Sequence, residues 1–167
     1  MPSLQLNIQA LAQSLVSLCI EKHLTFGTAE SCTGGLISAS VTDVPGVSAA
    51  FFGGVVSYDN SVKAGVLGVK NETLSAYGAV SAETAQEMSC GARRLLGVDF
   101  AVSVTGIAGP GGGTKEKPVG LVYISVASPK ECAVTKNLFK GTREEVRLQT
   151  VEKALLLLTE EIRKNEG

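Results

Sequence analysis

The sequence predicts a single α/β domain, residues 1–167, with a mixed sheet and helices on both of its faces. Short apolar runs alternate with segments of helical periodicity along the whole chain of 167 residues. This alternation is typical of open α/β sheets. The last two apolar runs, at 119–127 and 132–139, are joined only by Ser128-Pro129-Lys130-Glu131, a link so short that the two strands must be antiparallel.

The expected elements follow from periodicity and from capping residues. Strands are predicted at 24–29, 50–57, 99–104, 119–127 and 132–139, and helices at 7–22 and 34–42. Asn60 is the expected cap of a short helix beyond it, and Ser81 that of a longer helix that Gly97 closes. Thr142 and Glu145 have the spacing of a capping box and predict a long final helix.

Composition excludes several functional classes. Hydrophobic residues make up 44% of the chain and charged residues 19%, with a formal net charge of −1. We therefore expect a globular protein without an electrostatic surface for nucleic acid or an anionic membrane. No apolar stretch of the roughly 18 residues of a membrane span is evident, and the start of the chain does not resemble a secretory signal. These features predict a cytoplasmic protein.

The cysteines and the histidine limit the possible chemistry. Cys19, Cys32, Cys90 and Cys132 are widely spaced without a C-x-x-C pair, so we expect reduced thiols in the cytosol. His23 is the only histidine, and it lies at the expected end of the first helix. A metal site and a Ser-His-Asp triad are therefore not expected, and neither is a cofactor.

The stretch 28–35, Thr-Ala-Glu-Ser-Cys-Thr-Gly-Gly, is expected to form a strand-to-helix turn. Open α/β sheets usually place their chemistry at such turns. Ser31 and Cys32 are two candidate nucleophiles beside a carboxylate, Glu30, and the glycines let the backbone approach a ligand closely. An ordinary helix cap by Ser31 or Thr33, with Cys32 in the core, explains the same residues.

A second predicted strand-to-helix turn carries Tyr58 and Lys63. A serine nucleophile needs a base, and without a usable histidine the base must be a lysine whose pKa is lowered by desolvation. Lys63 is the best placed lysine, and we expect the positive end of a helix dipole to lower its pKa. Tyr58 could relay the proton or orient the amine. A set of Glu30, Lys63 and Cys32, with the thiolate attacking, is the open alternative.

The glycine-rich loop at 106–113 is the second prominent feature. It does not match a P-loop or a dinucleotide fingerprint, yet its backbone N–H groups could surround an anion or a sugar. Arg143 opens the final helix and could hold a phosphate, although a solvated side chain explains it equally. The substrate-binding residues expected from this loop and its strand are Thr105, Gly106, Gly109, Gly111 and Gly112.

Nearly the whole chain resembles the C-terminal domain of CinA-type proteins. The resemblance rests, in order, on residues 29–35, 57–63 with 67–69, 105–110 with 117–120, and 139–147. It implies a three-layer α/β/α sandwich with a mostly parallel sheet, often assembled as a homodimer. It also implies a metal-free amidohydrolase that converts nicotinamide mononucleotide to nicotinate mononucleotide and ammonia.

The resemblance further implies a catalytic set of Ser31, Tyr58 and Lys63. N–H groups of the turn that contains Cys32, Thr33, Gly34 and Gly35 are then expected to hold the oxyanion, and Glu30 to orient or bind. The partner would be a small nucleotide substrate, with no nucleic acid or membrane. The alternative is a non-catalytic nucleotide-binding or adaptor domain with a competence or DNA-damage role, which would need neither Ser31 nor Lys63.

Overall fold

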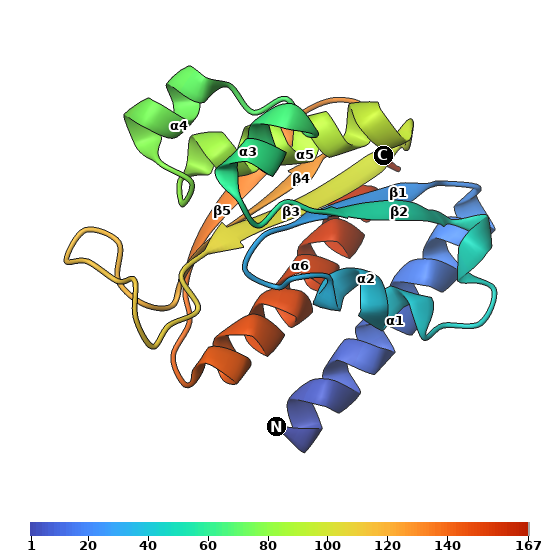
Figure 1. The fold of residues 1–167 in the computed structure, drawn as a ribbon. Coiled ribbons are helices and arrows are strands. Elements are labelled where there is room, and N and C mark those ends of the chain that lie inside the picture. Colours follow the sequence, from blue (N-terminus) through green and yellow to red (C-terminus); the bar gives the residue numbers. More distant parts are fainter. Residues whose placement is uncertain (167) are drawn as a thin grey trace.

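The computed structural model describes residues 1–166 and contains a five-stranded sheet in the order β2-β1-β3-β4-β5 (Figure 1). Strand β1 pairs in parallel with both β2 and β3, whereas β4 is antiparallel to β3 and to β5. Four of the five strands therefore point the same way, which confirms the predicted mixed, mostly parallel sheet. The strands are β1 (Phe26–Glu30), β2 (Phe51–Val56), β3 (Phe100–Gly106), β4 (Leu121–Ala127) and β5 (Cys132–Leu138).

Helices cover both faces of this sheet, and the three-layer prediction is confirmed (Figure 1). One face carries α1 (Pro2–Lys22), α2 (Leu36–Thr42) and α6 (Arg143–Lys164), and the other carries α3 (Asn60–Gly65), α4 (Asn71–Tyr77) and α5 (Ala82–Leu96). Each interface has its own apolar core. Leu15, Phe26 and Leu155 belong to the larger one, and Leu67 and Met88 to the smaller one.

The predicted helix caps are largely those observed. The Ser81 hydroxyl accepts from the Thr84 N–H, and Gly97 closes α5 in a left-handed conformation. Thr142 and Glu145 form the expected capping box of α6. The predicted cap of α3 is wrong by one residue: the carboxylate of Asp59, not Asn60, accepts from the N–H of the following turn.

Helix α4 was not predicted from the sequence, because its own residues provide little signal. Its N-cap, Lys70, makes no side-chain capping bond. Glu87 of α5 substitutes for one: it accepts from the Lys70 N–H at 2.9 Å and from the Thr73 hydroxyl at 2.6 Å. A carboxylate at a helix N-terminus is stabilising, but here it comes from a distant segment.

The expectation of four reduced cysteines is wrong for two of them. Cys90 of α5 and Cys132 of β5 form a disulfide across 42 positions of sequence, whereas Cys19 and Cys32 are free and buried. Neither spacing nor composition reveals this pair, because it depends on how α5 crosses the sheet. The cysteine pattern consequently no longer supports the cytosolic expectation.

Helix α1 also differs from expectation. Among the helices of residues 1–166, it alone is long and apolar enough, by length and composition, to cross a membrane. The core helix of a soluble protein meets the same criteria. In this fold α1 packs against α6 and buries Ile8, Ala12, Leu15, Val16 and Cys19.

Candidate active site

Ser31 lies directly beyond the carboxyl end of β1, in the centre of the parallel part of the sheet. Its N–H donates to the Val104 carbonyl of β3 at 3.1 Å, which fixes the start of the turn. The next parallel strand, β2, ends at Val56 and leads into α3, which carries Lys63. Parallel strands bring their carboxyl ends together, so the two predicted turns meet at one edge of the sheet.

Lys63 is the most informative side chain of this edge. It is 1% exposed, and its Nζ lies 3.1 Å from the Ser31 Oγ. The same Nζ donates to the main-chain carbonyls of Ser57, at 2.7 Å, and Tyr58, at 3.0 Å. Three oxygen partners thus hold a buried amine in one position against the serine hydroxyl.

These partners accommodate a neutral amine. Carbonyl oxygens only accept, so the Ser57 and Tyr58 carbonyls occupy both N–H groups of a neutral Lys63. The remaining lone pair can then accept the Ser31 hydroxyl proton. Burial lowers the pKa of Lys63 from its usual value of 10.5, opposed by the charges of Asp59 and Cys32. Of the two predicted causes, desolvation and a helix dipole, desolvation is therefore the main one.

The Tyr58 side chain does not form the predicted link between Ser31 and Lys63. It is 60% exposed, and its hydroxyl accepts from the Arg143 Nη2 at 3.3 Å. Among the described residues, the hydrogen bond from the amine to Tyr58 goes to its main-chain carbonyl. The predicted proton relay is thus corrected, whereas the other predicted role, orienting the amine, is filled by the Tyr58 backbone carbonyl. The phenol lies at the mouth of the site.

Glu30 was predicted to orient the turn or to bind substrate, and its contacts in the structure are of the first kind, which corrects the second. Its side chain is fully buried and accepts four hydrogen bonds. They come from the Thr33 hydroxyl at 2.7 Å, the Ile37 N–H at 2.8 Å, and the Ser38 N–H and hydroxyl at 3.0 and 2.8 Å. The carboxylate therefore stabilises the N-terminus of α2, on the face of the sheet opposite α3.

Cys32 lines the same pocket as Ser31, but its environment is unfavourable for a nucleophile. The thiol is buried, and burial raises its pKa to about 12, with a smaller contribution from the charge of Glu30. A thiol with such a pKa is almost entirely protonated near neutral pH, and only the thiolate attacks efficiently. The geometry favours Ser31 over its neighbour.

The turn after Ser31 has two N–H groups that could hold an oxyanion. The Gly34 N–H donates to the Ser31 carbonyl at 3.1 Å and is thereby occupied. Within residues 1–166, neither the Cys32 N–H nor the Thr33 N–H donates to a main-chain carbonyl. Gly34 and Gly35 have φ values of 59° and 106°, a region that favours glycine, so they allow the chain to enter α2.

A cavity of about 200 Å³ opens in front of Ser31. The Thr105 hydroxyl donates to the Ala79 carbonyl at 2.7 Å and ties β3 to the segment before α5. Gly111 and Gly112 are exposed and do not line this cavity, and Gly109 contributes its carbonyl to the Arg143 Nη1, at 2.8 Å. The lining residues are Ser31, Cys32, Tyr58, Lys63, Ala79, Val80, Thr105, Gly106, Ala108 and Arg143.

Arg147 is a residue of this site for which no role was predicted. Its Nε donates to the Cys32 carbonyl at 3.1 Å, and its Nη2 donates to the Thr33 carbonyl at 3.0 Å. The one sequence signal is its spacing: Arg143 and Arg147 are four residues apart and share a face of α6.

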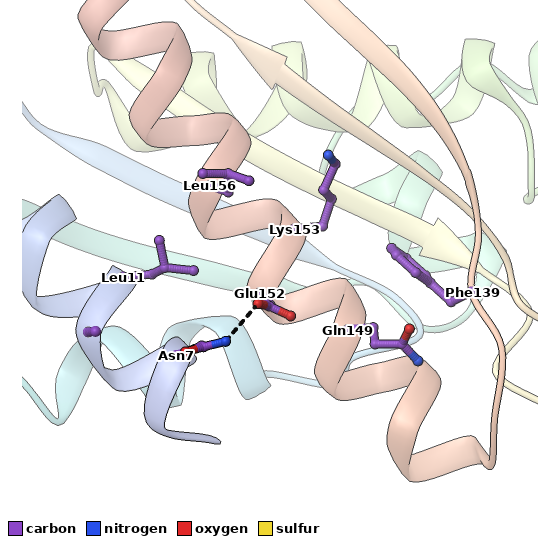
Figure 2. A pocket seen from close by; sticks show the side chains of 8 residues that line it. Asn7, Leu11, Phe139, Gln149, Glu152, Lys153 and Leu156 are labelled. Atoms are coloured by element: carbon purple, nitrogen blue, oxygen red, sulfur yellow. Dashed lines mark hydrogen bonds between the residues drawn. The ribbon is translucent and has the colours of Figure 1, made fainter. Parts of the chain in front are cut away.

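A larger cavity lies elsewhere, between α1 and α6 (Figure 2). It measures about 530 Å³, and the Asn7 amide donates across it to Glu152 at 3.4 Å. Leu11, Phe139 and Leu156 form its apolar part. None of the residues that line it lines the Ser31 cavity. Residues 1–166 contain no group of three or more His, Cys, Asp or Glu side chains that could hold a metal ion.

Fold and site together define an open α/β protein with a buried serine–lysine pair at the carboxyl end of its parallel strands. Residues 8–162 match the family model of the CinA C-terminal domain. The chain belongs to this family.

The most similar relatives include a CinA-like protein of Leptospira borgpetersenii, 51% identical over 92% of this chain and 37% of its own length. A putative competence-damage inducible protein of Desulforudis audaxviator is 52% identical over 84% of the chain and 34% of its own length. The chain thus spans about a third of these relatives.

Solved structures resemble it over nearly all of their length. The competence/damage inducible protein of Agrobacterium tumefaciens is 44% identical, with a TM-score of 0.89 over 91% of this chain and 93% of its own. The competence damage-inducible protein of Klebsiella pneumoniae is 34% identical, with a TM-score of 0.90 over 93% of this chain and 97% of its own.

Proposed function

We propose that this protein is an amidohydrolase that converts nicotinamide mononucleotide to nicotinate mononucleotide and ammonia. The observation that carries the proposal is the 3.1 Å contact between the buried Lys63 amine and the Ser31 hydroxyl. A serine hydroxyl is a weak nucleophile unless a base is positioned beside it. A lysine with a lowered pKa, whose other contacts are carbonyls, is such a base.

In the first half-reaction the Ser31 Oγ attacks the carboxamide carbon while Lys63 takes its proton. The tetrahedral intermediate collapses when protonated Lys63 gives this proton to the amide nitrogen, and ammonia leaves. The nicotinoyl group is then an ester on Ser31. The two carbonyls that hold Lys63 keep its third N–H directed at the serine, as a general acid requires.

In the second half-reaction water attacks the ester carbonyl and Lys63 accepts a proton from it. The proton returns to the Ser31 Oγ as the product leaves as a carboxylic acid, which loses its remaining proton to solvent, and the pair is restored. The Cys32 and Thr33 N–H groups, which donate to no main-chain carbonyl within the described residues, are the donors that would stabilise both oxyanions. Each such donor contributes ~3–4 kcal/mol in comparable sites.

The size and the lining of the cavity support a small aromatic amide as the reacting group. At about 200 Å³ it is small, and Ala79, Val80 and Ala108 supply apolar walls. The ribose and phosphate would remain at the mouth, where the exposed Arg143 guanidinium lies beside the Tyr58 phenol. A phosphate at Arg143 would use binding energy remote from the amide to position it.

Ammonia release from purified protein and nicotinamide mononucleotide tests the proposal. Ser31→Ala and Lys63→Met should each lose turnover by ~10⁴-fold or more, as removal of a nucleophile or its base does in other hydrolases. Ser61→Ala, which alters an exposed hydroxyl of α3, is the matched control and should keep full turnover. An active Ser31→Ala protein would remove Ser31 from the mechanism.

The same assay separates the alternative class. Binding of the mononucleotide without any ammonia release over a broad pH range would favour a nucleotide-binding or adaptor domain. Arg143→Met would then weaken binding, whereas Ser31→Ala and Lys63→Met would not.

A further inference from the structure

Arg147 makes contacts that the two half-reactions do not use. From the second turn of α6 its guanidinium reaches two consecutive carbonyls, those of Cys32 and Thr33, across 115 and 114 positions of sequence. The side chain is partly buried, and no ion pair between it and a carboxylate is found in residues 1–166. Placing a charged group there without a counter-ion costs stability, so carbonyl binding is its compensation.

The contacts fix the peptide planes of the nucleophile turn. In a trans peptide the carbonyl and the following N–H point in opposite directions. Holding the Cys32 carbonyl toward α6 therefore directs the Thr33 N–H away from α6. Holding the Thr33 carbonyl does the same for the Gly34 N–H, which then donates to the Ser31 carbonyl.

We infer that Arg147 is a positioning residue that keeps the Thr33 N–H available to the oxyanion. It also holds the Ser31 backbone in the position from which the Ser31 hydroxyl can attack. The inference rests on the proposed function. The guanidinium charge also polarises both peptide groups and strengthens their N–H donors. Arg147 itself does not touch the substrate in this assignment, in contrast to Arg143 at the mouth.

Arg147→Met removes the contacts, and Arg147→Lys keeps the charge but loses the two-pronged donor geometry. Arg163→Met, at an exposed arginine of the same helix, is the control. Each variant is tested for the rate at which a fluorophosphonate labels Ser31, for kcat and KM with the mononucleotide, and for thermal unfolding. Labelling reports on nucleophile and oxyanion geometry without requiring the proposed substrate, and Ser31→Ala identifies the labelled residue.

We expect both Arg147 variants to label Ser31 and to turn over substrate ~10- to 100-fold more slowly, with KM changed less than about twofold. Arg163→Met should behave like the wild type. If Arg147→Met does not fold, folded Arg147→Lys carries the comparison.

Folded variants that label at the wild-type rate would overturn the inference and leave Ser31 as the nucleophile. A loss confined to KM would overturn it too, since it would make Arg147 a substrate-binding residue. A wild-type protein that labels at Ser31 but releases no ammonia would refute the proposed substrate. The labelling rates of the Arg147 variants alone would then test the positioning role of Arg147. Absence of labelling in the wild type would overturn both.

Discussion

Glu30 and Ser31 are adjacent in the chain, yet their side chains act on opposite faces of the sheet. Glu30 accepts four hydrogen bonds around the N-terminus of α2, whereas Ser31 meets Lys63 of α3. The alternation of side chains along a strand produces this division. One residue anchors the turn, and the next is presented to the cavity.

The anchoring role of Glu30 predicts a loss of stability in Glu30→Gln. The amide NH2 group would face N–H and hydroxyl donors, so at least one charge-assisted hydrogen bond is lost, at a cost of about 2–3 kcal/mol. Urea unfolding measures this change. Glu160→Gln, at an exposed carboxylate of α6, is the control. Equal stability of the two variants would contradict the anchoring role.

The lowered pKa of Lys63 predicts how catalysis depends on pH. Only the neutral amine can accept the Ser31 proton, and burial lowers the pKa of Lys63 from 10.5. We expect kcat/KM to rise with pH and to level off below 10.5, with the midpoint at the depressed pKa. A pH–rate profile checks this. A rising limb centred at or above 10.5 would show that burial does not tune this lysine.

The lowered pKa of Lys63 also makes the free energy of unfolding depend on pH, in a direction that can be predicted. Between the depressed pKa of Lys63 and 10.5, the unfolded chain binds more protons than the folded chain. The free energy of unfolding should therefore rise with pH across that window. Lys63→Met should remove this contribution to the slope, as measured by urea unfolding at several pH values. An unchanged slope in Lys63→Met would contradict the assignment.

Cys32→Ala should remain catalytically active. Burial raises the pKa of this thiol to about 12, so it contributes almost no thiolate at neutral pH. We expect turnover within about threefold of the wild type, because a small buried side chain is replaced by a slightly smaller one. Thiol-directed alkylating reagents should not inactivate the wild type at neutral pH. An inactive Cys32→Ala with an active Ser31→Ala would assign the chemistry to the thiol.

Reduction of the Cys90–Cys132 disulfide should destabilise the fold without affecting the serine–lysine pair directly. Closing a loop of 42 residues contributes about 4 kcal/mol in the chain-entropy model. Thermal unfolding with and without reductant measures the effect. The double variant Cys90→Ser, Cys132→Ser should show the lower stability under both conditions. Equal unfolding of the oxidised and reduced wild type would show that the bond does not contribute.

Local signals in the sequence predicted most of the fold. Ser81, Gly97 and the Thr142–Glu145 pair mark helix ends through contacts within a few residues, and such contacts can be recognised without tertiary structure. Helix α4 was missed because its N-terminus depends on Glu87, a residue of another helix. The disulfide was missed because its two cysteines also belong to different elements, α5 and β5, which only the tertiary fold brings together.

The site was predicted in part. The meeting of Ser31 and Lys63 follows from the rule that parallel strands gather their carboxyl ends. The direction of the Glu30 side chain required the exact end of β1, and element boundaries are the least certain part of such predictions. The contacts of Arg147 depend on how α6 docks on the sheet, which no local pattern encodes.

The docking of α6 on the nucleophile turn has a consequence for folding. The turn at Cys32 and Thr33 is completed by a helix more than 100 residues later in the chain. Contacts of such sequence separation form late, after the entropy of closing a long loop has been overcome. In a refolding experiment, recovery of Ser31 reactivity should therefore lag behind the formation of helices, and it would report the arrival of the last helix.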